Sequence, residues 1–100
     1  MTATGSKVVV ITGASAGVGR ATARAFAERG AKIGLLARGE AGLDAAKREV
    51  VDAGGEAVAI QTDVADAEAL EAAAKTVEDA FGPIDVWVNN AMTSVFSPAS

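Results

Sequence analysis

The chain has 100 residues, half of them hydrophobic and 22% charged, with a formal net charge of −4, a composition typical of one globular domain. It contains no cysteine and no histidine, which excludes a disulfide framework and argues against a metal site. The nine Lys and Arg residues are scattered, so no nucleic-acid partner is expected. Without a signal-type segment or an apolar run of about 18 residues, we expect a cytoplasmic protein with no membrane partner.

The first predicted strand covers residues 7–12, a β-branched run that ends in glycine, as strands buried on both faces do. Good helix formers fill residues 18–29, and Gly30 follows, as glycine does just past a helix end. Arg20 and Arg24 of this helix are interpreted as solvated. Its predicted apolar stripe consists of Val18, Thr22, Ala25 and Phe26.

A second strand and a second helix are predicted at residues 32–37 and 42–53. Two consecutive glycines, Gly54 and Gly55, close the helix. The side chains expected to face inward are Leu43, Ala46 and Val50.

The third strand is predicted at residues 56–62, and a helix running from an N-cap at Asp66 to residue 81 follows it. The fourth strand is predicted at residues 84–89, where Asp85 and Trp87 are interpreted as structural. The residues that share one face of the helix are Leu70, Ala74, Val77 and Phe81.

Four strands that alternate with three helices predict an α/β fold with a parallel sheet, right-handed crossovers and helices on both faces. The order βαβαβαβ is that of the N-terminal half of a doubly wound sheet, for which we expect the strand order 3-2-1-4. Ligands bind such sheets outside the carboxyl ends of the strands, so the functional residues are expected there.

The loop after the first strand holds three glycines within seven positions. A helix N-terminus attracts a pyrophosphate if no side chain obstructs it. Gly13 would allow a tight turn, Gly17 close approach of the phosphates, and Gly19 tight packing of the helix on the sheet. The alternative is ordinary turn punctuation, but the position between a strand and a helix favours nucleotide binding. Thr12 is expected to fix the turn by hydrogen bonding.

Three stretches resemble the short-chain dehydrogenases/reductases. They are Thr12-Gly-Ala-Ser-Ala-Gly-Val-Gly19, which matches the family pattern TGxxxGxG, the pair Asp63-Val64, and Asn89-Asn-Ala91, which is similar to the family's NNAG. Met92 stands where the family has glycine. The resemblance implies that residues 1–100 are an incomplete NAD(P)-binding Rossmann domain of an oxidoreductase.

The end of the second strand bears on the choice of cofactor. NAD sites place an acid there to bind the ribose 2′-OH, whereas an arginine accommodates the 2′-phosphate of NADP. Ala37 occupies the position where NAD sites have the acid, and Arg38 follows it, so NADP is favoured over NAD. The alternative is that Arg38 is a solvated loop residue. Ser15 would add a hydroxyl donor, whereas Ala16 occupies the position of the family's other basic residue for NADP.

Asp63 would accept a hydrogen bond from the adenine amino group while Val64 offers its backbone, or Asp63 would merely help to start the next helix. Asn89 and Asn90 would meet the cofactor ribose, or pair with neighbouring strands. The predicted cofactor-binding residues are Gly13, Ser15, Ala16, Gly17, Val18, Gly19, Arg38, Asp63, Val64, Asn90 and Ala91.

The resemblance implies catalysis by a serine, a tyrosine and a lysine, yet the sequence contains no tyrosine, and no catalytic residue is assigned. We therefore expect a fragment or truncated product, inactive alone, of an enzyme that acts on a small carbonyl or alcohol substrate, with a homo-oligomer expected for the full-length protein. The alternative is a non-catalytic NADP(H)-binding module. An open edge at the fourth strand, lined by residues 86–88, predicts marginal stability or self-association.

Overall fold

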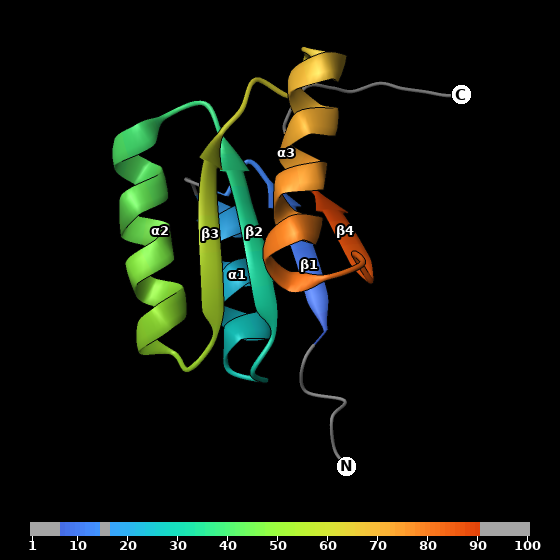
Figure 1. Ribbon diagram of the computed structural model, residues 1–100. Coiled ribbons are helices and arrows are strands. Elements are labelled where there is room, and N and C mark those ends of the chain that lie inside the picture. Colours follow the sequence, from blue (N-terminus) through green and yellow to red (C-terminus); the bar gives the residue numbers. More distant parts are fainter. Residues whose placement is uncertain (1–6, 15–16, 91–100) are drawn as a thin grey trace, which may run out of the picture.

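A computed structural model describes residues 7–14 and 17–90 as one parallel sheet with three helices (Figure 1). The strand order is β3-β2-β1-β4, as predicted. In chain order the elements are β1 (Val8–Thr12), α1 (Gly17–Ala27), β2 (Lys32–Ala37), α2 (Glu40–Asp52), β3 (Glu56–Gln61), α3 (Ala67–Phe81) and β4 (Val86–Asn89).

The two faces of the sheet carry separate apolar clusters because successive strand residues point to opposite sides. Val9 and Ile11 of β1 belong to the cluster beneath α1 and α2, whereas Val8 and Val10 belong to the one beneath α3. Figure 1 shows α3 on one side of the sheet and α1 on the other. Helices therefore cover both faces, as the alternation of elements predicted.

α3 lies close to β2 because β2 has a glycine in its middle. A Cβ atom added at Gly34 would lie 2.4 Å from Cγ2 of Val77. A glycine inside a strand is unfavourable in isolation, and it commonly marks a position where another element approaches closely. Gly34 thus sets the distance between α3 and the sheet.

The predicted inward stripe of α1 is wrong. Val18 is 70% exposed, and the buried residues are Gly19, Ala23 and Ala27. These three small residues recur every four positions and share a face, so they let the helix backbone approach the sheet. Of the predicted stripe, Phe26 is partly buried and packs against the apolar cluster beneath α1 and α2.

The other two helices turn the predicted faces inward. Leu43, Ala46 and Val50 of α2 are buried, and Val77 is fully buried in α3. Asp66 caps α3 as predicted, since its Oδ1 accepts hydrogen bonds from the N–H groups of Glu68 and Ala69 at 3.1 and 3.2 Å. Within the described part of the chain, none of the helices is both long and apolar enough to cross a membrane.

Candidate functional site

The carboxyl ends of the four strands meet at one edge of the sheet. Thr12 of β1 is paired with Leu36 of β2 on one side and with Asn89 of β4 on the other. Ala37, the last residue of β2, is paired with Gln61 of β3. The residues that follow these positions include most of the predicted site, so the topology brings them to one edge.

Gly13 and Gly19, which flank the middle of the glycine loop, lie close together. Gly13 has a φ of +65°, a conformation that glycine adopts without steric cost. A Cβ atom at Gly19 would lie 2.2 Å from the carbonyl oxygen of Gly13. Gly19 therefore allows the first turn of α1 to rest on the turn after β1, which refines the predicted packing of helix on sheet.

Gly17 differs from Gly19 in what surrounds it. Its φ is +30°, and a Cβ atom there would meet nothing within 4 Å. Apart from its two chain neighbours, no atom of the described residues fills this space, which leaves room beside the backbone of the first turn. We call this open space the cradle; the approach of phosphates to it stays a prediction.

The first turn of α1 contains no acidic side chain of its own. α2 and α3 each place an acidic residue in their first turn, Glu40 and Glu68, whereas α1 has none. The N–H groups of a first helical turn have no acceptor within the helix, and acidic side chains or anions stabilise them. The N-terminus of α1 is therefore suited to an anionic ligand.

Arg38 follows β2 directly, and its side chain is exposed at the site edge. Ala37, at the position where an acid would hold a ribose, is only 4% exposed. The carbonyl oxygen of Arg38 accepts a hydrogen bond from Nε2 of Gln61 at 2.8 Å. The backbone of Arg38 is thus held by β3.

Asp63 helps to start α3, which is the alternative considered above. Its Oδ1 accepts a hydrogen bond from the N–H of Ala65 at 2.9 Å, and its carbonyl accepts one from the N–H of Asp66 at 2.9 Å. The residue is exposed and Val64 is half-buried. A contact of either residue with adenine stays a prediction.

The hydroxyl of Thr12 joins the end of β1 to the end of β4. It donates to Oδ1 of Asn89 at 2.9 Å and accepts from the N–H of Asn90 at 3.0 Å. Asn89 thus makes the structural pairing that was its alternative. Thr12 was expected to fix the turn after β1 by hydrogen bonding, whereas its hydroxyl bonds the end of β4 instead. Among the described residues, Nδ2 of Asn90 is buried without a hydrogen-bond partner. Such a donor is costly to leave unpaired, so it fits a site that a polar ligand completes.

Four residues singled out above, Ser15, Ala16, Ala91 and Met92, lie outside the described residues. Asp85 is structural as predicted, although it precedes β4 rather than belonging to it. Its Oδ2 accepts a hydrogen bond from the N–H of Val8 at 2.9 Å.

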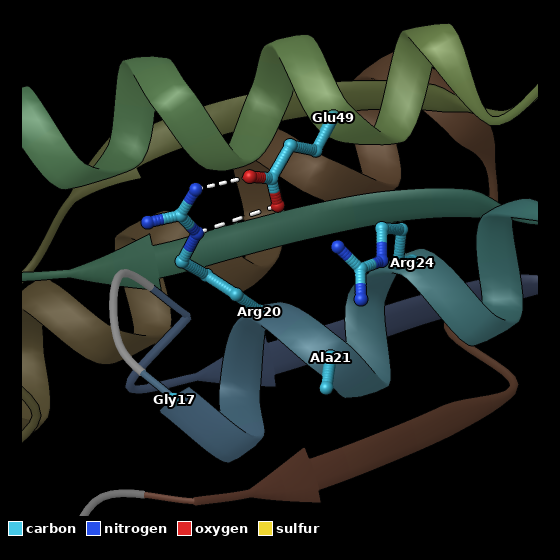
Figure 2. A pocket seen from close by; sticks show the side chains of 5 residues that line it. All are labelled: Gly17, Arg20, Ala21, Arg24 and Glu49. Atoms are coloured by element: carbon cyan, nitrogen blue, oxygen red, sulfur yellow. Dashed lines mark hydrogen bonds and ion pairs between the residues drawn. The ribbon is translucent and has the colours of Figure 1, made fainter.

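No sequence pattern indicated the ion pair that links α1 to α2. Arg20 is bonded through both Nε and Nη2 to the carboxylate of Glu49, with 3.3 Å between Nε and Oε1. Figure 2 shows the two side chains meeting between the helices, with Arg24 on the same flank of α1. The pair lines a surface hollow of about 250 Å³ beside Gly17.

The ion pair changes the interpretation of Arg20 as a solvated residue. The hydrogen bond from Arg20 lowers the pKa of Glu49, and the same bond raises the pKa of Arg20. The two side chains are 35% and 31% exposed, so solvent screens them only in part. The charge of Arg20 is thereby offset by a neighbour and is drawn toward α2.

Comparison with known proteins agrees with this geometry. Residues 7–100 match the model of the short chain dehydrogenases. The chain belongs to the short chain dehydrogenase family. It is 45% identical over 92 residues to a 3-oxoacyl-[acyl-carrier-protein] reductase of Synechocystis, a match that covers 91% of this chain and 37% of that protein.

Solved structures of other proteins superpose on the fold. The L-sorbose reductase of Gluconobacter frateurii, complexed with NADPH and L-sorbose, has a TM-score of 0.82 and 41% identity over 90% of this chain and 35% of that one. NAD⁺-bound xylitol dehydrogenase has a TM-score of 0.78 and 37% identity over 81% of this chain and 31% of that one. The chain spans between 26% and 37% of the length of the curated relatives it matches. These relatives include complexes with either cofactor, so family membership leaves the choice between NAD and NADP open.

Proposed function

We propose that this short chain dehydrogenase sequence is the cofactor-binding part of an oxidoreductase that uses NADP(H). The observation that carries the proposal is the open backbone at Gly17, at the start of a helix whose first turn contains no acidic residue. The unpaired buried Nδ2 of Asn90, directly after β4, supports a ligand that spans this edge. A dinucleotide has the phosphates, ribose hydroxyls and length that such donors would bind.

The preference for NADP over NAD rests on the end of β2. Ala37 offers no carboxylate to a 2′-OH, and a carboxylate there would repel a 2′-phosphate. The exposed guanidinium of Arg38 suits a phosphate because its planar donors bind two oxygens at once. The NADPH complex of the L-sorbose reductase shows that the family includes members that bind the phosphorylated cofactor.

The proposed reaction is hydride transfer between a nicotinamide and a small carbonyl or alcohol compound. When bound, the nicotinamide supplies or accepts the hydride, and a proton is exchanged at the substrate oxygen. The residues assigned here hold the adenosine and diphosphate part, and none of them is assigned to the proton transfer. A cytoplasmic location and a homo-oligomer belong to this proposal as well. A binding module without catalysis is the second candidate, and an assay of hydride transfer with a panel of ketones separates the two.

The substitution Arg38→Asp tests the cofactor preference. The affinities for NADPH and NADH are measured by calorimetric titration of the protein and of the variant. We expect NADPH binding to weaken at least tenfold, because a guanidinium is lost and a carboxylate faces the phosphate, while NADH binding is retained or improved.

The matched control is Arg29→Asp, which makes the same charge change at an exposed residue beyond the opposite end of α1. It should leave the ratio of the two affinities unchanged. An unaltered ratio in Arg38→Asp itself would show that Arg38 does not recognise the phosphate.

A further inference from the structure

The end of β2 is held by hydrogen bonds to three successive carbonyl groups. The carbonyl of Leu36 accepts from the N–H of Ala14 in the glycine loop at 3.2 Å, and that of Ala37 accepts from the N–H of Thr62 after β3 at 2.8 Å. The third, the carbonyl of Arg38, accepts from the side-chain amide of Gln61 at 2.8 Å. The loop and β3 thus both fix the backbone that leads to α2.

The bond from Gln61 differs from the other two because its donor is a side chain. Arg38 lies one residue beyond the last register pair of β2 and β3, which joins Ala37 to Gln61. The next residue, Gly39, is the N-cap of α2 and makes no side-chain capping bond. The amide of Gln61 therefore extends the pairing of the two strands by one residue, at the junction between strand and helix.

We propose that Gln61 is a positioning residue for Arg38 and thereby contributes to the preference for NADPH over NADH. This inference rests on the proposed function. An arginine side chain loses much conformational freedom when it binds a phosphate. A fixed backbone reduces the number of positions from which the guanidinium starts, so less freedom is lost on binding. NADH has no 2′-phosphate, so its binding does not depend on this fixation.

The substitution Gln61→Met removes the donor and keeps a side chain of similar length. We expect the affinity for NADPH to fall about three- to tenfold, which corresponds to the loss of one hydrogen bond, while the affinity for NADH is unchanged. In an Arg38→Ala background the same substitution should change neither affinity, because the residue through which Gln61 acts is absent. Gln61→Leu serves as a second variant without the donor.

A measurement without cofactor follows the backbone directly. The N–H of Leu43 bonds to the carbonyl of Gly39 at 3.2 Å, the first hydrogen bond of α2. Hydrogen exchange of the Leu43 N–H should become faster in Gln61→Met, since the junction between β2 and α2 is less constrained. Unchanged exchange would overturn the inference.

The remaining outcomes separate the two proposals. An equal loss of affinity for both cofactors, or a loss that persists in the Arg38→Ala background, would overturn the role of Gln61 and leave the NADP preference intact. If the unsubstituted protein binds both cofactors equally, or if Arg38→Asp leaves the ratio unchanged, the NADP preference fails first and the role of Gln61 fails with it. A loss specific to NADPH that requires Arg38 supports both.

Discussion

At the residue scale, Gly19 and Gly17 are glycines for different reasons. A Cβ atom at Gly19 would collide with backbone, because the carbonyl oxygen of Gly13 would lie 2.2 Å away, whereas a Cβ atom at Gly17 would enter open space. Packing of the protein therefore requires Gly19, whereas the positive φ of Gly17 favours glycine there and the proposed ligand would use the open space beside it. Substitution of Gly19 should therefore mainly affect stability, and substitution of Gly17 should mainly affect cofactor binding.

Gly19→Ala should lower the free energy of unfolding by about 1–3 kcal/mol, the usual cost of overpacking, because the loop must move away from α1.

Gly17→Ala should lower the free energy of unfolding by about 1 kcal/mol through its backbone conformation and should weaken NADPH binding more than tenfold, because the methyl group fills the cradle. Urea denaturation and calorimetric titration measure the two effects. Gly39→Ala is the matched control, with a φ of −94° and open space around it, and it should change stability by less than about 0.5 kcal/mol. Normal NADPH binding by Gly17→Ala would contradict the role given to the cradle.

At the element scale, α1 and α2 are joined by the pair Arg20–Glu49, and the pKa of Glu49 is lowered chiefly by the hydrogen bond from Arg20. A carboxylate whose pKa is lower in the folded state than in the unfolded state stabilises the fold above its unfolded pKa, about 4.3 for glutamate. This contribution is lost as the pH falls from that value through the folded pKa.

Glu49→Gln should therefore reduce the dependence of stability on pH between about pH 5 and pH 3, because the titrating group is gone. Thermal unfolding followed by circular dichroism across this range, at low and high salt, is the measurement. Glu71→Gln is the control, since it removes the same charge from an exposed residue of α3 on the other face of the sheet. If Glu49→Gln and the unaltered protein lose stability in parallel on acidification, the ion pair does not stabilise the contact of the two helices.

Much of the arrangement of elements was predictable from the sequence, and the exceptions have physical causes. Leu43, Ala46 and Val50 are spaced along α2 so that the pattern alone identifies the buried face. In α1 the buried face consists of small residues, whose hydrophobicity is too weak to distinguish it from the outer stripe with Val18. A hydrophobic pattern predicts a face reliably only where large side chains fill the core.

The side-chain contacts of the site were not predictable in the same way. The hydrogen bond of Gln61 with Arg38 joins residues 23 positions apart, and the pair Arg20–Glu49 joins residues 29 positions apart. Each depends on the register of two strands or the crossing of two helices, which no local pattern encodes. The glycine spacing, in contrast, indicated the loop because its backbone requirement is local.

At the scale of the whole molecule, β4 is an edge strand: among the described residues it pairs with β1 alone. Its Trp87 is 40% exposed. A strand at a sheet edge offers unpaired backbone groups to another chain, and a charged side chain on it opposes such pairing. We therefore expect the 100-residue chain to self-associate, and we expect Trp87→Lys to reduce the association.

Sedimentation velocity over a hundredfold range of protein concentration tests this expectation. Val51→Lys is the control, because Val51 is also an exposed apolar residue, at 53%, but lies on α2, and it should leave the association unchanged. A monomer at every concentration with a sharp unfolding transition independent of concentration would count against an exposed β4 edge.

The hydroxyl of Thr12 has a consequence for how the molecule moves. The hydroxyl donates its one proton to Asn89 and accepts a hydrogen bond from the N–H of Asn90. These two residues follow Thr12 by 77 and 78 positions along the chain, so one side chain links distant segments. The backbone entering the glycine loop begins at the next residue. We therefore expect a displacement of Asn89 or Asn90 to be transmitted to the start of that loop through one residue.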